Sequence, residues 1–148
     1  MVVLSEQSVI THEEEAVTKE SGTGEVERIK DLIAESERLW LARDLDGYVG
    51  LWDSQALFLW PDQDPIVGRE AIRSWHQGLL DQVEYREMHH DIKETEVAGS
   101  WAFAWGFGSG STIRKASGER REFRIKLVYI LRKQADGSWA FYRTMINY

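Results

Sequence analysis

The chain has 148 residues, a length typical of one domain, and 43% of them are hydrophobic, which is enough for a packed core. It has no cysteine, which excludes disulfides and thiolate chemistry, and its formal net charge of −7 argues against general binding to nucleic acid. No apolar run approaches the roughly 18 residues of a membrane span. The opening segment MVVLSEQSVI also lacks the pattern of a secretory signal. We therefore expect a cytoplasmic protein that binds neither nucleic acid nor membrane.

Residues 1–23 are mostly polar and include an acidic run from His12 to Glu15 and a Ser/Gly-rich stretch from Ser21 to Gly24. Such a composition predicts a polar N-terminal tail. Residues 24–148 are then expected to form the single domain.

Three helices are predicted in the first half of this domain. The first runs from about Gly24 to about Asp44, because its apolar residues recur at helical spacing: Val26, Ile29, Leu32, Ile33, Leu39 and Trp40. The stretch DLDGYVGLW, residues 44–52, predicts a second, short helix. The run ALFLWP, residues 56–61, predicts a strand that ends at proline, and a third helix follows Gly68.

The second half of the domain predicts four strands, over residues 84–97, 101–113, 119–132 and 139–147. Gly99, Gly118 and Gly137 mark the short connections between them. Strands joined by such short turns pair as antiparallel hairpins. Helices followed by an antiparallel sheet indicate an α+β fold.

The second of these strands has an unusual alternation. Trp101, Phe103, Trp105 and Phe107 alternate with alanine and glycine, so one face carries four large rings and the other almost nothing. Two interpretations are open. The rings either fill the hydrophobic core, as strand aromatics usually do, or line a ligand pocket.

The order and spacing of these segments resemble the nuclear transport factor two-like superfamily, in its SnoaL-like and ketosteroid-isomerase-like branch. The resemblance extends over about Glu25 to Tyr148. The segments that carry it are LARDLDGYVGLW (41–52), ALFLWP (56–61), VGREAI (67–72), VAGSWAFA (97–104) and DGSWAFYR (136–143).

The resemblance implies a cone-shaped, curved antiparallel sheet wrapped around three N-terminal helices, an architecture also called cystatin-like. It implies a pocket between the concave face and the first helix, and a homodimer through the convex face. It further implies that the four rings of the aromatic strand point into the cone. Trp101 and Phe103 would then belong to the core, and Trp105 and Phe107 to the pocket.

The steroid isomerase of this family uses an aspartate base, with a tyrosine and a neutral aspartic acid as the oxyanion hole. The corresponding positions here hold Trp60, Ser36 and Leu127. An indole cannot accept a proton from carbon, and leucine cannot donate to an oxyanion. We therefore expect no steroid isomerase activity.

His90 is the main candidate for a general base. It shares the apolar parity of Met88 and Ile92, so it is expected to face inward while His89 faces water. A neutral histidine in the cone can act as a general base, although a core histidine bonded to a neighbour remains the alternative. Tyr129 is expected to face the cone as a hydrogen-bond donor.

The other polar candidates have simpler explanations. His76 lies on the third helix beside Trp75 and is a weaker candidate, while Asp44, Asp46 and Asp53 are expected at helix ends, where aspartate caps. Adjacent residues of a strand point to opposite faces, so His89 and His90 cannot bind one metal ion, and no metal site is predicted.

Three functions remain open. The first is binding of a small hydrophobic molecule, planar or alicyclic, by a SnoaL-like domain without isomerase residues. The second is a lyase, isomerase or cyclase acting on a polyketide- or terpenoid-like metabolite, held between His90 as base and Tyr129 as donor. The third is a non-catalytic homo-oligomerising association domain, whose cone is filled by its own tryptophans. No cofactor is expected. The predicted ligand-lining residues are Trp40, Trp60, Trp75, Trp105, Phe107 and Tyr142, the last in one of two possible registers of its strand.

Overall fold

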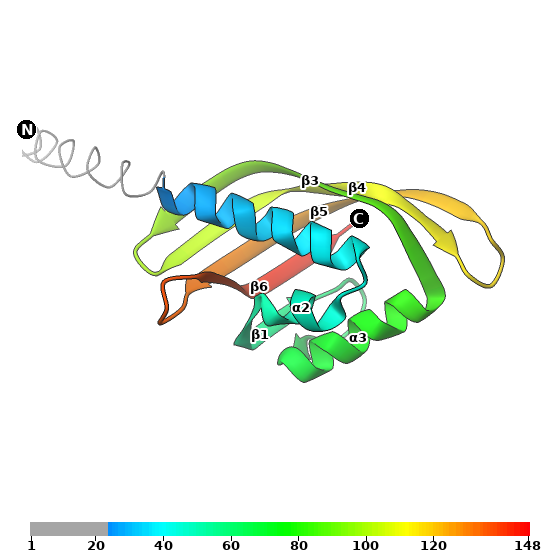
Figure 1. Ribbon diagram of the computed structural model, residues 1–148, viewed down its shortest axis with the longest axis horizontal. Coiled ribbons are helices and arrows are strands. Elements are labelled where there is room, and N and C mark those ends of the chain that lie inside the picture. The colour runs from blue at the N-terminus through cyan, green and yellow to red at the C-terminus, as the bar shows by residue number, and fades with distance from the viewer. Residues whose placement is uncertain (1–23) are drawn as a thin grey trace, which may run out of the picture.

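The computed structural model describes residues 24–148, so the predicted tail at residues 1–23 lies outside the described residues. A first helix occupies residues 24–41 of this part. The elements that follow are α2 (Leu45–Gly50), β1 (Trp52–Leu59), β2 (Ile66–Val67), α3 (Arg69–Gln82), β3 (Val83–Ala98), β4 (Trp101–Arg114), β5 (Arg120–Lys133) and β6 (Trp139–Asn147). Figure 1 shows the first helix lying across the sheet. No helix in residues 24–148 is long and apolar enough to cross a membrane.

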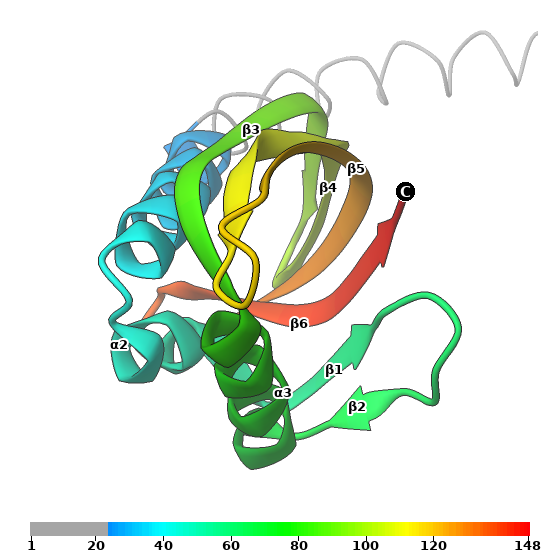
Figure 2. The same ribbon diagram turned by 90° about the vertical axis from the view of Figure 1, so that its right-hand side faces the viewer.

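The six strands form one curved, open sheet in the order β2-β1-β6-β5-β4-β3, which confirms the predicted α+β cone. Every pair is antiparallel except β1 and β6, which run parallel. Figure 2 shows β3 to β6 curling around one side of the molecule, with α2 and α3 below the first helix. Sequence reasoning missed β2, and β1 begins at Trp52 rather than Ala56.

The first helix buries one face against the sheet. Ile29, Ile33, Ser36 and Trp40 are each at most 7% exposed, at spacings of three and four residues. The helix ends at residue 41, three residues before the predicted end, because the backbone of Arg43 turns into the left-handed region. Asp44 then caps α2, its side chain accepting a hydrogen bond from the Gly47 backbone N–H.

Two irregularities in β3 bend the sheet. The pairing of β3 with β4 shifts register between Tyr85 and Glu87 and again between Ile92 and Glu94. Opposite the second shift, a Cβ atom on Gly106 would lie 2.1 Å from the Asp91 carbonyl oxygen. Glycine on β4 therefore makes room for the backbone of its bent neighbour.

The orientation of the aromatic strand is the reverse of the prediction. Trp101, Phe103 and Trp105 are 39–42% exposed on the convex face, whereas Ala102 and Ala104 are at most 6% exposed on the concave face. The expectation that these rings point into the cone was wrong. A Cβ atom on Gly106 would meet the Asp91 backbone and one on Gly108 the Ile125 side chain, so this side of β4 has room only for small residues and the rings lie outside.

Candidate functional site

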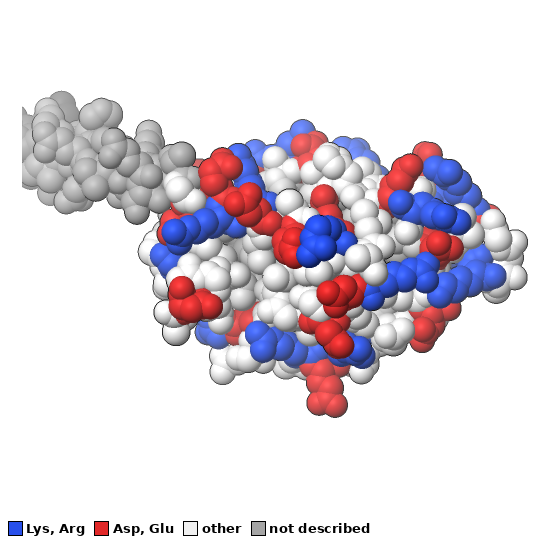
Figure 3. Space-filling model, in the orientation of Figure 1, with Lys and Arg blue, Asp and Glu red and all other residues white. Residues whose placement is uncertain are grey.

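The concave side of the sheet encloses a cavity of about 920 Å³. Its walls come from the first helix, α2, α3 and all the long strands. Ten of its lining residues are large aromatics: Trp40, Tyr48, Trp52, Phe58, Trp60, Trp75, Tyr85, Phe123, Tyr129 and Tyr148. Most of the exposed lining residues, among them Arg114 and Arg121, belong to the β4–β5 hairpin, so the cavity is open at that end. Figure 3 shows Lys and Arg side chains at that end of the molecule.

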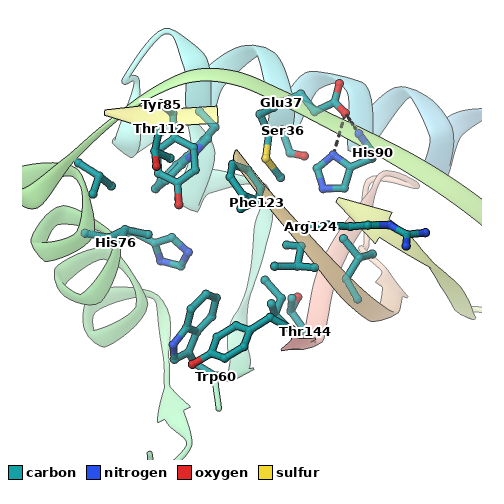
Figure 4. A pocket seen from close by; sticks show the side chains of 18 of the residues that line it. Ser36, Glu37, Trp60, His76, Tyr85, His90, Thr112, Phe123, Arg124 and Thr144 are labelled. Atoms are coloured by element: carbon teal, nitrogen blue, oxygen red, sulfur yellow. Dashed lines mark hydrogen bonds and ion pairs between the residues drawn. The ribbon is translucent and has the colours of Figure 1, made fainter. Parts of the chain in front are cut away.

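His76 projects from α3 into the aromatic part of the cavity (Figure 4). Its ring packs against five aromatic rings at centroid distances of 4.9–5.9 Å: those of Trp40, Tyr48, Trp52, Phe58 and Trp75. Nδ1 lies 2.7 Å from the Ile72 carbonyl oxygen, so Nδ1 carries the proton and donates. Burial lowers the pKa of His76 to about 4, so the ring is neutral near pH 7.

A second polar group lies across the cavity from His76. His90 Nδ1 is 2.8 Å from Glu37 Oε1, and His90 Nε2 is 3.0 Å from the Tyr129 hydroxyl oxygen. The His90 backbone N–H also donates to Glu37 Oε1. Figure 4 shows Glu37 reaching His90 from the first helix. The three residues form a hydrogen-bonded chain, which we call the Glu37–His90–Tyr129 chain.

Burial and hydrogen bonding set the charges in this chain. Burial acts to raise the pKa of Glu37, but the hydrogen bonds from the His90 ring and backbone outweigh it and hold that pKa below its usual value. Glu37 is therefore ionised and accepts the Nδ1–H of His90. Burial raises the pKa of Tyr129 well above its usual value, so the phenol keeps its proton.

Five of the residues predicted for the site line this cavity: Trp40, Trp60, Trp75, His90 and Tyr129. His90 is inward and His89 is exposed, as expected. The prediction that a substrate fits between His90 and Tyr129 was wrong, because the two are directly hydrogen-bonded. The pair instead presents one continuous polar group to the cavity.

Trp105, Phe107 and Tyr142 do not line the main cavity, so their predicted placement there was wrong. Trp105 and Phe107 face outward with the rest of the aromatic strand, and the Arg124 guanidinium lies 4.2 Å from the Phe107 ring centroid. Tyr142 falls where the β5–β6 register shifts, and its ring packs on Trp101 on the outer face. That bulge turns Phe141 and Thr144 inward instead.

Sequence reasoning missed Glu37. It lies four residues after the buried Ile33 and three before the buried Trp40. That spacing places it at the edge of the buried face, where the side chain is 22% exposed. A carboxylate at this position could have been noticed as a candidate partner for an inward histidine.

Asp44 caps α2 and Asp46 lies in its first turn, as expected, but Asp53 is not at a helix end, because it lies within β1. Asp46 pairs with Arg73 at 2.7 Å, and Asp53, which is 1% exposed, pairs with Arg132 through both carboxylate oxygens. In residues 24–148 no three histidine or acidic side chains lie close enough together to hold a metal ion.

Comparisons with known proteins place this arrangement in a family. The model of the SnoaL-like domain matches residues 29–142. A search of curated proteins finds no match. The chain is similar in structure to a ketosteroid isomerase-like protein from Erwinia carotovora atroseptica SCRI1043, at 21% identity and a TM-score of 0.73, covering 80% of this chain and 91% of that one.

Two further solved structures share the fold. A conserved protein from Planctomyces limnophilus DSM 3776 is 17% identical with a TM-score of 0.76, covering 84% of this chain and 97% of its own. A protein from Catenulispora acidiphila, solved in complex with S-DNPA, is 17% identical with a TM-score of 0.67, covering 82% and 90%. Identities at this level establish the fold alone.

Proposed function

The chain belongs to the SnoaL-like domain family, and on this premise we propose that its cavity binds a small, mainly apolar ring compound. The observation that carries the proposal is the cavity itself. About 920 Å³ lies within the range of ligand pockets, roughly 300–1,000 Å³. Its inner wall is largely aromatic, as is usual in such sites, and its charged residues lie mainly on the β4–β5 hairpin.

Two further points support binding of a ligand. An association domain would fill its cone with its own tryptophans, whereas four tryptophans here surround open space. One protein of the same fold, from Catenulispora acidiphila, was solved with a small molecule, S-DNPA. A complex with a ligand therefore has a precedent among proteins of this fold.

The residues of the cavity argue against steroid isomerisation. Ser36, Trp60 and Leu127, which the resemblance places at the three catalytic positions, all line the cavity. Ser36 already donates its hydroxyl proton to the Ile33 carbonyl oxygen at 2.6 Å, and the other two side chains cannot perform the required steps.

Tryptophan fluorescence tests the binding proposal, because the seven tryptophans divide between the cavity and the rest of the molecule. We expect naphthalene to quench the wild-type emission with saturation, and the Trp60→Phe variant to lose a larger share of the quenching than Trp105→Phe. A linear, unsaturated response, or equal losses in the two variants, would contradict binding in the cavity.

A second candidate function, proton transfer, is favoured by the Glu37–His90–Tyr129 chain. We propose that Tyr129 meets the substrate, His90 holds the transferred proton and Glu37 positions the imidazole. A carbon acid next to a carbonyl would give its proton to the Tyr129 oxygen while the Tyr129 proton passes to His90 Nε2. The products of this step are an enolate and the imidazolium form of His90, whose Nδ1–H faces the Glu37 carboxylate. Transfer of both protons in the reverse direction regenerates the starting protonation states of Tyr129 and His90. Lyase, isomerase and cyclase reactions on polyketide- or terpenoid-like metabolites use such a step.

Hydrogen–deuterium exchange of β-tetralone in deuterated water tests this function without knowledge of the natural substrate. We expect the wild type to accelerate exchange beside the carbonyl by at least about 100-fold, the usual lower range for general acid–base catalysis. Tyr129→Phe and His90→Gln should lose the acceleration, and Trp101→Phe, on the convex face, should keep it. Exchange at the rate of buffer would overturn the proton-transfer function while leaving the binding proposal intact.

We also propose that a second copy of the chain covers the convex face. The register of the sheet places three parallel rows of side chains on this face. The row on β3 is acidic (Asp91, Glu94, Glu96), and the row on β4 consists of the aromatic rings. The row on β5 has two aliphatic residues flanked by basic ones (Arg124, Lys126, Val128, Ile130, Arg132). If two copies pack face to face about a two-fold axis along β4, the rings of one copy contact the rings of the other. The acidic row of each copy then lies opposite the basic residues of its partner. This charge pattern favours a homodimer over an unrelated partner.

A further inference from the structure

An uncommitted acceptor lies among the rings of the cavity. His76 is 4% exposed, and its Nδ1–H donates to the Ile72 carbonyl oxygen. Because the ring is neutral, Nε2 carries a lone pair and no proton. Among residues 24–148 Nε2 has no hydrogen-bond partner, although the side chain lines the cavity.

The surroundings of His76 make this acceptor selective. Five aromatic rings pack around the imidazole, so its immediate surroundings are mainly ring faces. A cation is disfavoured there for the same reason that the His76 pKa falls, since burial penalises charge. A neutral donor on an apolar molecule is the group that fits.

We propose that His76 Nε2 is the anchor for a hydroxyl group on the ligand, so that the cavity selects hydroxylated ring compounds over their apolar analogues. This inference rests on the proposed binding function and adds the chemical class of the ligand. The hydroxyl donates to Nε2 while the rings of Phe58 and Trp75 contact the apolar body beside it.

The Glu37–His90–Tyr129 chain does not compete for this role. In its neutral form His90 has both ring nitrogens engaged, by Glu37 and by Tyr129. His76 has one engaged nitrogen and one free. The two histidines therefore supply different chemistry at two places in one cavity, as Figure 4 shows.

Calorimetric titration with naphthol and methylnaphthalene, substituted at the same ring position, tests the inference. The pair differs only in hydroxyl against methyl. We expect the wild type to bind naphthol about tenfold more tightly, the effect of one net hydrogen bond. The His76→Phe variant should bind both compounds equally, and Trp101→Phe, on the convex face, should keep the preference for naphthol.

Each alternative outcome is informative. Equal affinities in the wild type, or a preference that survives in His76→Phe, would overturn the anchor role of His76 while the binding function stands. Binding of neither compound would overturn both. Should His76→Phe fail to fold, the ¹⁵N resonance of His76 Nε2 in the wild type tests the same inference. We expect this resonance to shift on addition of naphthol and not on addition of methylnaphthalene. A resonance that does not shift under saturating naphthol would reject the anchor role.

Discussion

At the scale of single residues, the pair of Asp53 and Arg132 ties β1 to β5. The carboxylate is buried and accepts from Arg132 at 2.7 and 2.9 Å and from the Gln55 backbone N–H at 2.8 Å. Burial acts to raise the pKa of Asp53, but these hydrogen bonds outweigh it and lower the pKa to about 2. Such a depressed pKa stabilises the folded state wherever the carboxyl is ionised.

The Asp53 pair predicts a pH dependence of stability. The folded pKa lies below the unfolded value of about 3.9, so the stabilisation is fully present above about pH 5 and is lost as the pH falls toward 2. Asp53→Asn should lower the free energy of unfolding at pH 7 by about 3 kcal/mol and flatten its dependence on acid pH. Urea unfolding from pH 7 to pH 2 measures both.

The matched control for this pair is Asp46→Asn. Its exposed pair with Arg73 should contribute nothing measurable, because solvent screens exposed charges. Equal unfolding free energies for the two variants at pH 7 would refute the role of Asp53.

At the scale of elements, the bend of the sheet depends on glycine at close approaches of β3 and β4. Gly106 is buried, and its added Cβ would meet Asp91 backbone atoms, which cannot move aside as a flexible side chain could. Gly78, within α3, has nothing within 4 Å of the same atom. The two glycines therefore differ in function although both lie inside regular elements.

Alanine at these two positions should have opposite effects on stability. Gly106→Ala should lower the free energy of unfolding by at least about 2 kcal/mol through overpacking. Gly78→Ala should raise it by about 0.5–1 kcal/mol, because alanine loses less backbone entropy in a helix. Chemical denaturation of both variants checks this, and a stable Gly106→Ala protein would show that the strands do not need glycine there.

Local sequence patterns predicted some features of the helices and strands and not others. Periodicity and turn residues predicted the helices, the long strands and the inward parity of His90 and Tyr129, because these depend on local spacing. The direction of the β4 rings and the register of Tyr142 depend on curvature and on a bulge between β5 and β6, which no local pattern encodes. Glu37 was missed because its partner lies 53 positions away in the chain.

At the scale of the whole molecule, two apolar aromatic surfaces lie on opposite sides of one sheet. The concave surface lines the cavity, and the convex surface exposes Trp101, Phe103 and Trp105 together with Val128 and Ile130. A patch of this kind is uncommon on a monomer. We propose that the first surface binds a ligand and the second another copy of the chain.

The assignment of the convex face predicts a change of mass on mutation. The wild type should be a homodimer by size-exclusion chromatography with light scattering, and Trp105→Lys should be a monomer, because a charge would be buried unpaired at the interface. Val67→Lys, at an exposed valine on β2 outside this face, should remain a dimer. A monomeric wild type at high protein concentration would contradict the assignment.

The most direct test of the central claim is to locate bound naphthol by intermolecular nuclear Overhauser effects. The two aromatic surfaces give different results, since each has its own tryptophans. We expect contacts from naphthol protons to Phe58, Trp60 and Trp75 inside the cavity. Contacts to Trp101, Phe103 and Trp105 on the convex face would contradict the central claim.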